Sequence, residues 1–181
     1  KESLDFSQCS SFNLDEYIGL APEDVNSYRY YMNERLFNRI NIDLANTYLP
    51  NGVAEDIAAE CSVYEQCIKE LGGIDLQLLG IGCTGHIGFN EPLSALRSRT
   101  RAKALTPETC EQNAPMFGGD ITQVPKRAIT MGVGTILDSE RCVLLATGSA
   151  KASIVAQAME GPVTAMISAS ALQLHPHCTI V

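Results

Sequence analysis

The sequence has no Cys-x-x-Cys pair, although it contains seven cysteines in 181 residues. The ligand spacing of a common zinc site is therefore missing, and we expect no metal site. The sequence also has no long apolar span and no pattern typical of a secretory signal, which predicts no contact with a membrane. Because the number of cysteines is odd and several lie in apolar runs, we expect free thiols in a reducing, cytoplasmic compartment.

Positive charge is scarce in this chain. It has 13 Lys and Arg residues against 21 Asp and Glu residues, a formal net charge of −8 that argues against a nucleic-acid partner. A small anionic substrate is still compatible with this balance, because a few cations suffice to bind one locally. Hydrophobic residues make up 45% of the sequence, and no repeat, low-complexity tract or linker interrupts it, so we predict one folded domain over residues 1–181.

Apolar strands alternate with amphipathic helices along the chain. We expect strands at residues 9–14, 76–81, 128–131, 142–146 and 179–181. We expect helices at about 27–38, 54–71, 135–139, 152–159 and 168–174, and a short one beginning at residue 106. The apolar stripe of the helix at 27–38 and the strand at 76–81 should be buried. Alternation of this kind requires crossover connections, which predicts an α/β fold with a mostly parallel sheet and helices on both faces.

The loop after the strand at 76–81 carries residues suited to proton transfer. It holds four glycines between residues 80 and 88, together with His86 and Glu91. A lone histidine is often structural, but a histidine in a glycine-dense loop at a strand end is well placed to move protons, with Glu91 as its partner. Asp15 follows the strand at 9–14 and could reach the same crevice as a carboxylate base. Its alternative role is that of a solvated loop charge.

Lys151 follows a strand and a Gly-Ser turn and stands at the start of a helix. Free amides and the helix dipole at such a position can bind an anion, and the lysine adds a full positive charge. The alternative is an ordinary helix start with a surface lysine, and the pattern by itself favours neither. Together, these features suit proton transfer on a phosphorylated small molecule.

Several longer motifs resemble those of the glucosamine-6-phosphate deaminase family. The motifs that carry the resemblance are Leu14-Asp-Glu-Tyr-Ile-Gly-Leu20, Asn26-Ser-Tyr28, Gly85-His-Ile-Gly-Phe-Asn-Glu-Pro92, Ser98-Arg-Thr-Arg101, Gln123-Val-Pro-Lys126, Gly148-Ser-Ala-Lys151 and Ser170-Ala-Leu-Gln-Leu-His175. The resemblance implies a Rossmann-like three-layer fold and the conversion of glucosamine 6-phosphate and water to fructose 6-phosphate and ammonia. It also implies a role in amino-sugar metabolism and N-acetylglucosamine catabolism, with no metal or redox cofactor.

The resemblance also implies roles for individual residues. Asp15 matches the base that moves a proton between C2 and C1, His86 the group that opens the sugar ring, and Glu91 its carboxylate partner. Thr84 stands beside the histidine among the catalytic positions. The residues matched to substrate and phosphate binding are Lys151, Gly82, Gly85 and Tyr28. The residues matched to the site where some members bind the activator N-acetylglucosamine 6-phosphate between subunits are Ser94, Arg101 and Lys103. Family members include hexamers and monomers, so this match permits a homo-oligomer but leaves the oligomeric state open.

The chain departs from the family pattern in four respects. The family's early strand with its phosphate loop and its C-terminal helix have no counterpart in these 181 residues. Thr84 replaces an Asp or Asn, so we expect weakened rather than abolished function. Pro115 replaces an arginine that binds phosphate, so we expect weaker phosphate affinity. Two other functions therefore stay open: a non-catalytic sugar-phosphate-binding or regulatory relative, and a hydrolase resembling 6-phosphogluconolactonase.

Overall fold

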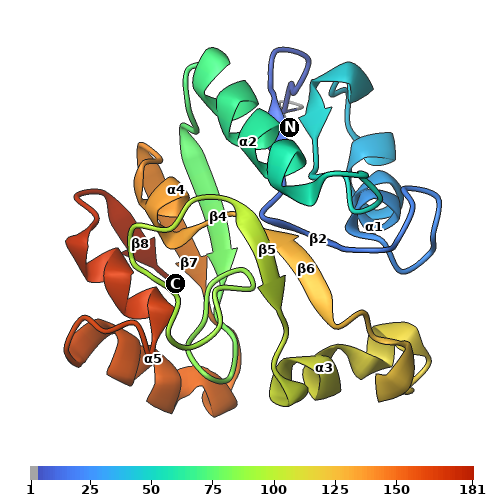
Figure 1. Ribbon diagram of the computed structural model, residues 1–181. Coiled ribbons are helices and arrows are strands. Elements are labelled where there is room, and N and C mark those ends of the chain that lie inside the picture. The colour runs from blue at the N-terminus through green and yellow to red at the C-terminus, as the bar shows by residue number, and fades with distance from the viewer. Residues whose placement is uncertain (1–3) are drawn as a thin grey trace.

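A computed structural model describes residues 4–181, which form a mixed α/β fold with three small sheets (Figure 1). The strands are β1 (Ser11–Phe12), β2 (Asp15–Tyr17), β3 (Thr47–Tyr48), β4 (Leu76–Gly80), β5 (Arg101–Ala104), β6 (Arg127–Thr130), β7 (Arg141–Leu145) and β8 (Cys178–Ile180). The α-helices are α1 (Tyr28–Arg35), α2 (Ile57–Glu70), α3 (Pro107–Asn113), α4 (Val133–Leu137) and α5 (Ala152–Glu160). The 3-10 helices are η1 (Phe37–Arg39), η2 (Leu44–Asn46), η3 (Ala114–Phe117), η4 (Ile121–Gln123), η5 (Ser149–Lys151) and η6 (Ser168–Leu174).

The prediction of parallel sheets is confirmed for two of the three. Strands β4, β7 and β8 run parallel in that order, and β1 pairs parallel with β3. The third sheet, β2-β6-β5, is antiparallel, so the prediction of a mostly parallel arrangement is wrong in this half. The antiparallel turn arises because the chain reverses between β5 and β6 through α3, η3 and η4, on the right of Figure 1.

The antiparallel sheet changes the position of Asp15. We expected it in a loop after a strand at 9–14, but that strand is reduced to Ser11–Phe12. Asp15 is instead the first residue of β2 and lies opposite Thr130, the last residue of β6. Its backbone is therefore held by strand pairing rather than by a loop.

Helix boundaries follow the capping residues that the sequence offers. The carboxylate of Asp56 accepts hydrogen bonds from the backbone N–H groups of Ala58 and Ala59 and begins α2. Gly72 and Gly73, both with positive φ, end this helix. Thr106 caps α3 through a hydrogen bond from the Thr109 backbone N–H, and Pro107 takes the first helical position, so the helix starts beside residue 106, where it was predicted.

The apolar stripe at 27–38 is not the core surface that we predicted. No residue of α1 is buried, and the helix ends at Arg35. Tyr31 and Leu36 are 46% and 40% exposed, while Phe37, in η1, is buried. The stripe therefore covers only part of the surface around β2.

Strand β4 is also less buried than predicted. Its side chains alternate, so that Leu79 is buried while Leu76 and Leu78 are 58% and 56% exposed. The buried side of this sheet packs against α2, α4, α5 and η6 in one apolar cluster. The cluster contains Tyr64, Ile68, Leu79, Ile136, Leu144, Ala158 and Leu172. Among the described residues, the side of β4 that carries Leu76 and Leu78 is not covered to the same extent. Within this part of the chain, every helix is too short or too polar to span a bilayer.

Candidate active site

The loop after β4 is attached to Asp15 through its backbone. The Phe89 N–H donates to Asp15 Oδ1 at 3.2 Å and to Thr130 Oγ1 at 3.1 Å. Gly88 has a φ of +54°, and a Cβ at this position would lie 3.0 Å from Thr130 Oγ1 and 3.2 Å from Asp15 Oδ1. A side chain at residue 88 would therefore crowd the carboxylate, which explains a glycine here.

Burial raises the pKa of Asp15 to about 6, and hydrogen bonds from Thr130 and from the Phe89 backbone only partly offset this effect. The nearby carboxylate of Glu16 raises it slightly further. A carboxyl group with such a pKa is ionised at neutral pH but is a stronger base than an exposed aspartate. It is therefore suited to taking a proton from carbon and returning it.

His86 lies in the same loop and is buried. Its Nδ1 is 2.8 Å from Thr84 Oγ1 and 3.6 Å from Glu91 Oε2. Burial lowers the pKa of His86, the Glu91 carboxylate raises it, and the Lys151 ammonium lowers it again. The predicted pairing of His86 with Glu91 is thus present as a close charge contact, while the hydrogen bond to the ring is made by Thr84.

Glu91 has a second contact that the sequence did not suggest. Its Oε1 accepts from the backbone N–H of Thr106 at 3.2 Å and from the Thr106 hydroxyl at 3.4 Å. Since Thr106 begins α3, one buried carboxylate connects the histidine to the start of that helix. Its other oxygen, Oε2, is buried without a hydrogen-bond partner.

The two glycines expected at the site serve close packing. A Cβ on Gly82 would lie 2.2 Å from both Cε1 and Nε2 of His86, so the imidazole rests directly on this residue. Gly85 has a φ of +79°, and a Cβ there would lie 2.6 Å from Ile167 Cγ2 and 3.0 Å from Ile154 Cδ1. The glycines therefore place the loop between the histidine ring and α5.

Lys151 is brought to the same loop from the start of α5. Its Nζ donates to the carbonyl oxygen of Ile81 at 2.8 Å and to Cys83 Sγ at 3.5 Å. Neither η5 nor α5 has a side-chain N-cap hydrogen bond, and Gly148 has a φ of +85°. The ammonium and the uncapped amides thus lie beside the histidine loop, as an anion-binding site requires.

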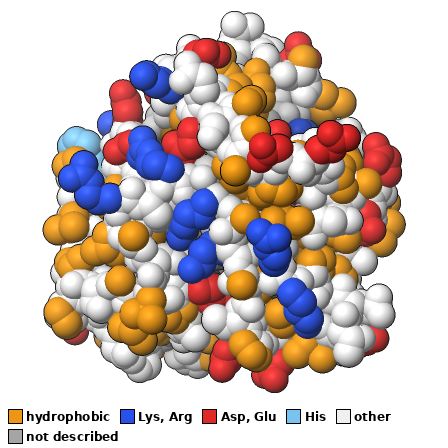
Figure 2. All heavy atoms as spheres, in the orientation of Figure 1, with side chains coloured by type: hydrophobic (Ala, Val, Ile, Leu, Met, Phe, Trp, Pro, Cys, Tyr) orange, Lys and Arg blue, Asp and Glu red, His pale blue; other side chains and the backbone are white. Residues whose placement is uncertain are grey.

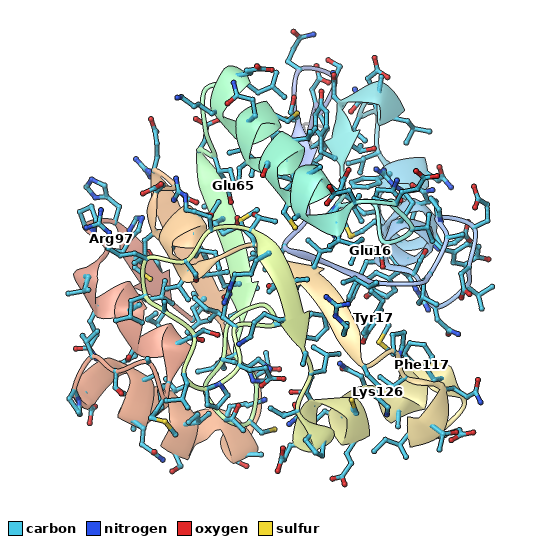
Figure 3. All side chains as sticks on the ribbon, viewed as in Figure 1. Glu16, Tyr17, Glu65, Arg97, Phe117 and Lys126 are labelled. Atoms are coloured by element: carbon cyan, nitrogen blue, oxygen red, sulfur yellow. The ribbon has the colours of Figure 1, made fainter. Side chains whose placement is uncertain are left out.

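Aromatic side chains pack beside Asp15. The rings of Tyr17 and Tyr28 stack with centroids 5.3 Å apart, and Phe117 meets Tyr17 edge-on at 5.5 Å. Figure 3 shows Tyr17 and Phe117 near each other at the lower end of β6. Burial raises the pKa of Tyr17 to about 12, and it raises that of Tyr28 well above its usual value. Tyr28 therefore contributes a neutral aromatic wall.

The sequence did not reveal the residues that hold the candidate site residues and their neighbours in place. The carboxylate of Glu16 accepts from the backbone N–H groups of Tyr17, Tyr28 and Arg29 at 2.8 to 3.0 Å and so joins β2 to α1. Thr130 supports the Asp15 contact. The adjacent acids at residues 15 and 16 drew attention to this segment. The pattern did not indicate that Asp15 faces the histidine loop while Glu16 binds backbone N–H groups.

The three residues matched to an activator site do not form a common contact. Ser94 is buried, and its hydroxyl donates to the Glu91 carbonyl oxygen at 2.7 Å. Arg101 and Lys103 lie two positions apart on β5 and so share one face of their sheet. Figure 2 shows cationic side chains gathered near the middle of the face on which β5 lies. Pro115 is exposed in η3.

Among residues 4–181, no group of three or more His, Cys, Asp or Glu side chains is arranged to hold a metal ion. The contacts described above bring Asp15, Thr84, His86, Glu91 and Lys151 together around one loop. Of the residues matched to an activator site, Ser94 touches this group through the Glu91 backbone, and no described hydrogen bond joins Arg101 or Lys103 to it.

Comparison with known proteins gives a consistent result. Residues 1–180 match the family model described as glucosamine-6-phosphate isomerases/6-phosphogluconolactonase. The glucosamine-6-phosphate deaminase of Cellvibrio japonicus is 56% identical over 176 residues, which is 97% of this chain and 66% of that protein. The glucosamine-6-phosphate deaminase of Geobacillus sp. is 53% identical, over 93% of this chain and 67% of its own. The chain thus spans about two thirds of the length of these curated relatives.

Two solved structures show the fold. A monomeric glucosamine-6-phosphate deaminase superposes with a TM-score of 0.95 at 46% identity, covering 98% of this chain and 73% of that one. A 6-phosphogluconolactonase from Thermotoga maritima superposes with a TM-score of 0.78 at 17% identity, covering 99% of this chain and 74% of that one. The second likeness concerns the fold alone.

Proposed function

The chain belongs to the glucosamine-6-phosphate isomerase/6-phosphogluconolactonase family, and we propose that it is an amino-sugar-phosphate deaminase. The reaction converts glucosamine 6-phosphate and water to fructose 6-phosphate and ammonia. The observation that carries the proposal is the Asp15 carboxylate, whose pKa is raised to about 6 and which is hydrogen-bonded to the loop of His86. An isomerisation between aldose and ketose needs such a base beside a group that opens the ring.

The proposed steps use this chain's own side chains. His86 moves a proton onto the ring oxygen as the sugar ring opens to the aldehyde. Asp15 takes the C2 proton and returns it to C1, while one proton of the substrate ammonium group passes to the C1 oxygen, which leaves a protonated imine at C2. Water adds to this imine, and ammonia leaves as the C2 carbonyl of fructose 6-phosphate forms. Glu91 and Thr84 hold the histidine.

Lys151 is proposed to bind the substrate phosphate. Its ammonium lies against the Ile81 carbonyl at the carboxyl end of β4, and the uncapped turn of η5 offers backbone amides beside it. Gly82 and Gly85 keep the loop close to this turn, and Tyr28 forms part of the aromatic wall near Asp15. Ser94, Arg101 and Lys103 remain a proposed site for N-acetylglucosamine 6-phosphate, which would act between subunits.

Further parts of the proposal concern architecture and location. We propose one domain with a Rossmann-like three-layer arrangement, supported by the parallel sheet β4-β7-β8 and by helices α2, which precedes β4, and α5, which follows β7. The exposed side chains of Leu76 and Leu78 argue against a complete second helical layer over β4. The free thiols support a reducing, cytoplasmic compartment.

Two alternatives differ in their products. A lactonase-like hydrolase would need to activate water against an ester, and its support is the fold shared with 6-phosphogluconolactonases. A non-catalytic relative would bind the sugar phosphate without releasing ammonia, and Pro115 favours this reading.

The test is to incubate the purified chain with glucosamine 6-phosphate, with galactosamine 6-phosphate and with 6-phosphogluconolactone. We expect ammonia and fructose 6-phosphate from the first compound, and loss of both with His86→Ala. Lactone hydrolysis without ammonia release would support the hydrolase. Binding of glucosamine 6-phosphate without either product would support the non-catalytic relative.

A further inference from the structure

The Nδ1 atom of His86 has two oxygen neighbours. Thr84 Oγ1 lies 2.8 Å from it, within hydrogen-bond distance, whereas Glu91 Oε2 lies at 3.6 Å, beyond the usual limit. A neutral imidazole carries one ring proton, and a hydroxyl can either donate or accept. The direction of the hydrogen bond between Thr84 and His86 therefore decides which ring nitrogen is protonated.

We propose that Thr84 is a positioning residue that accepts the Nδ1 proton of His86, in a hydrogen bond whose direction Glu91 sets, so that Nε2 is unprotonated in the resting protein. The proposal rests on the proposed function only in assigning a catalytic use to Nε2. The arrangement of the ring itself follows from the contacts around Nδ1.

The Glu91 carboxylate decides the direction of this hydrogen bond. Its Oε2 is buried and accepts no hydrogen bond, and Nδ1 of His86 lies 3.6 Å from it. If Thr84 donated to Nδ1, a nitrogen lone pair would face this buried oxygen at 3.6 Å, and the two would repel. If Nδ1 carries the proton, the partial positive charge of this N–H group lies between the Thr84 hydroxyl oxygen and the Glu91 carboxylate. The second arrangement has the lower electrostatic energy.

Gly82 holds the opposite edge of the ring. The position of a Cβ on this residue falls 2.2 Å from Nε2 and 2.7 Å from Cδ2 of His86, so the ring lies flat against the glycine backbone. The Gly82 N–H also donates to the His86 carbonyl oxygen at 2.8 Å. With Thr84 on one edge and Gly82 under the other, the ring is held in one orientation.

With Nε2 unprotonated, His86 acts first as a base in the ring-opening step. Its free Nε2 can take the proton of the anomeric hydroxyl, and the imidazolium so formed can deliver a proton to the ring oxygen as the C1–O5 bond breaks. The proton count of His86 is then unchanged after ring opening. A hydroxyl at residue 84 supports this sequence without adding a second negative charge beside Nδ1.

The tautomer can be measured on the full chain without any substrate. Long-range proton–nitrogen correlation NMR of histidine-labelled protein at pH 8 distinguishes the two neutral tautomers, and His86→Ala assigns the signals. We expect the pattern of a protonated Nδ1 for His86. His175 supplies an internal reference of the opposite kind, since its Nδ1 accepts from the His177 N–H at 3.0 Å and its Nε2 faces the Ser139 carbonyl oxygen at 2.8 Å.

Two variants separate the hydrogen bond from the shape of the side chain. Thr84→Val keeps the shape and removes the hydroxyl, and we expect faster exchange of the Nδ1 proton with water and a kcat lower by roughly tenfold or more, at similar KM. Thr84→Ser should restore both values, and unchanged His175 signals would show that the variants fold.

A wild-type His86 protonated at Nε2, or a Thr84→Val variant whose Nδ1 proton exchanges with water at the wild-type rate, would overturn the proposal. Because the NMR result does not depend on turnover, failure of the deaminase assay would leave this test intact.

Discussion

The Phe89 backbone N–H donates to the Asp15 carboxylate at 3.2 Å, across 74 positions in the sequence. This contact attaches the loop of His86 to the first residue of β2. Phe89 also packs against Tyr17, with ring centroids 5.6 Å apart, so the same residue gives Asp15 a hydrogen bond and helps to bury it. The carboxylate is thus held in place by the group that belongs to the other half of the proposed site.

Replacing Asp15 with Asn should stabilise the protein at alkaline pH. A carboxyl pKa raised from 3.8 to about 6 means that the folded state binds the proton more tightly than the unfolded state. The contribution of Asp15 to stability is therefore most favourable below pH 3.8 and is lost as the pH rises through 6. Above that pH, the charged group destabilises the fold by roughly 2 to 3 kcal/mol.

An asparagine can still accept the Phe89 hydrogen bond, so we expect Asp15→Asn to raise Tm by several degrees at pH 8 and by less at pH 5. Scanning calorimetry at both pH values checks this. Asp75→Asn, a substitution of an exposed aspartate, is the matched control. A lower Tm for Asp15→Asn at pH 8 would mean that the charge stabilises the fold.

The pH dependence of kcat/KM should show an acid limb near pH 6. Asp15 must be ionised to take a proton from carbon, and its raised pKa places this transition at about 6. Below that value, kcat/KM should fall about tenfold for each pH unit, measured by ammonia release in a series of buffers of constant ionic strength. A profile that stays level down to pH 4.5 would point to an unperturbed carboxylate.

Replacing Glu91 with Gln should lower the pKa of His86 further. The carboxylate raises this pKa, against the larger effect of burial, and the substitution removes its charge. Glutamine can still accept from Thr106, so α3 should keep its start. NMR titration of the imidazole provides the measurement. Glu108→Gln changes the same charge at an exposed position of α3 and should leave the titration unmoved; an equal shift in both variants would reject the pairing.

Replacing Lys151 with Met should weaken binding of the substrate phosphate. Loss of a charged hydrogen bond costs about 1.5–3 kcal/mol, which corresponds to a KM higher by roughly tenfold to a hundredfold. Steady-state kinetics with glucosamine 6-phosphate measure this change. Lys126→Met is the matched control, because Lys126 Nζ bonds the Ile121 carbonyl oxygen in a different part of the chain. Equal KM values for the two variants would remove Lys151 from the phosphate site.

Local patterns predicted the start of α3 and the loop well. Thr106 caps its helix, and the glycines at 82 and 85 lie where the loop packs most closely. Helix α2 begins at Ile57 behind the Asp56 cap, three residues later than predicted. The parallel strands β4 and β7 were predicted as well, because each is a short apolar run. A helix follows β7, whereas a long loop and strand β5 follow β4.

Features that depend on distant parts of the chain were not predictable in the same way. The antiparallel pairing of β2 with β6 joins residues more than 100 positions apart, and nothing in either strand specifies its direction. The exposure of Leu76 depends on which helices cover the sheet, which an apolar run cannot report. The separate roles of Asp15 and Glu16 follow from the backbone N–H groups that meet each carboxylate.

The most direct test of the proposed mechanism is exchange of the C2 proton of glucosamine 6-phosphate with solvent. The substrate is incubated with the chain in heavy water, and loss of the C2 proton signal is followed by NMR. The mechanism predicts exchange by the wild-type chain and none by Asp15→Asn, while Asp75→Asn exchanges as the wild type does. Exchange that persists in Asp15→Asn would show that another group is the carbon base and would contradict the mechanism.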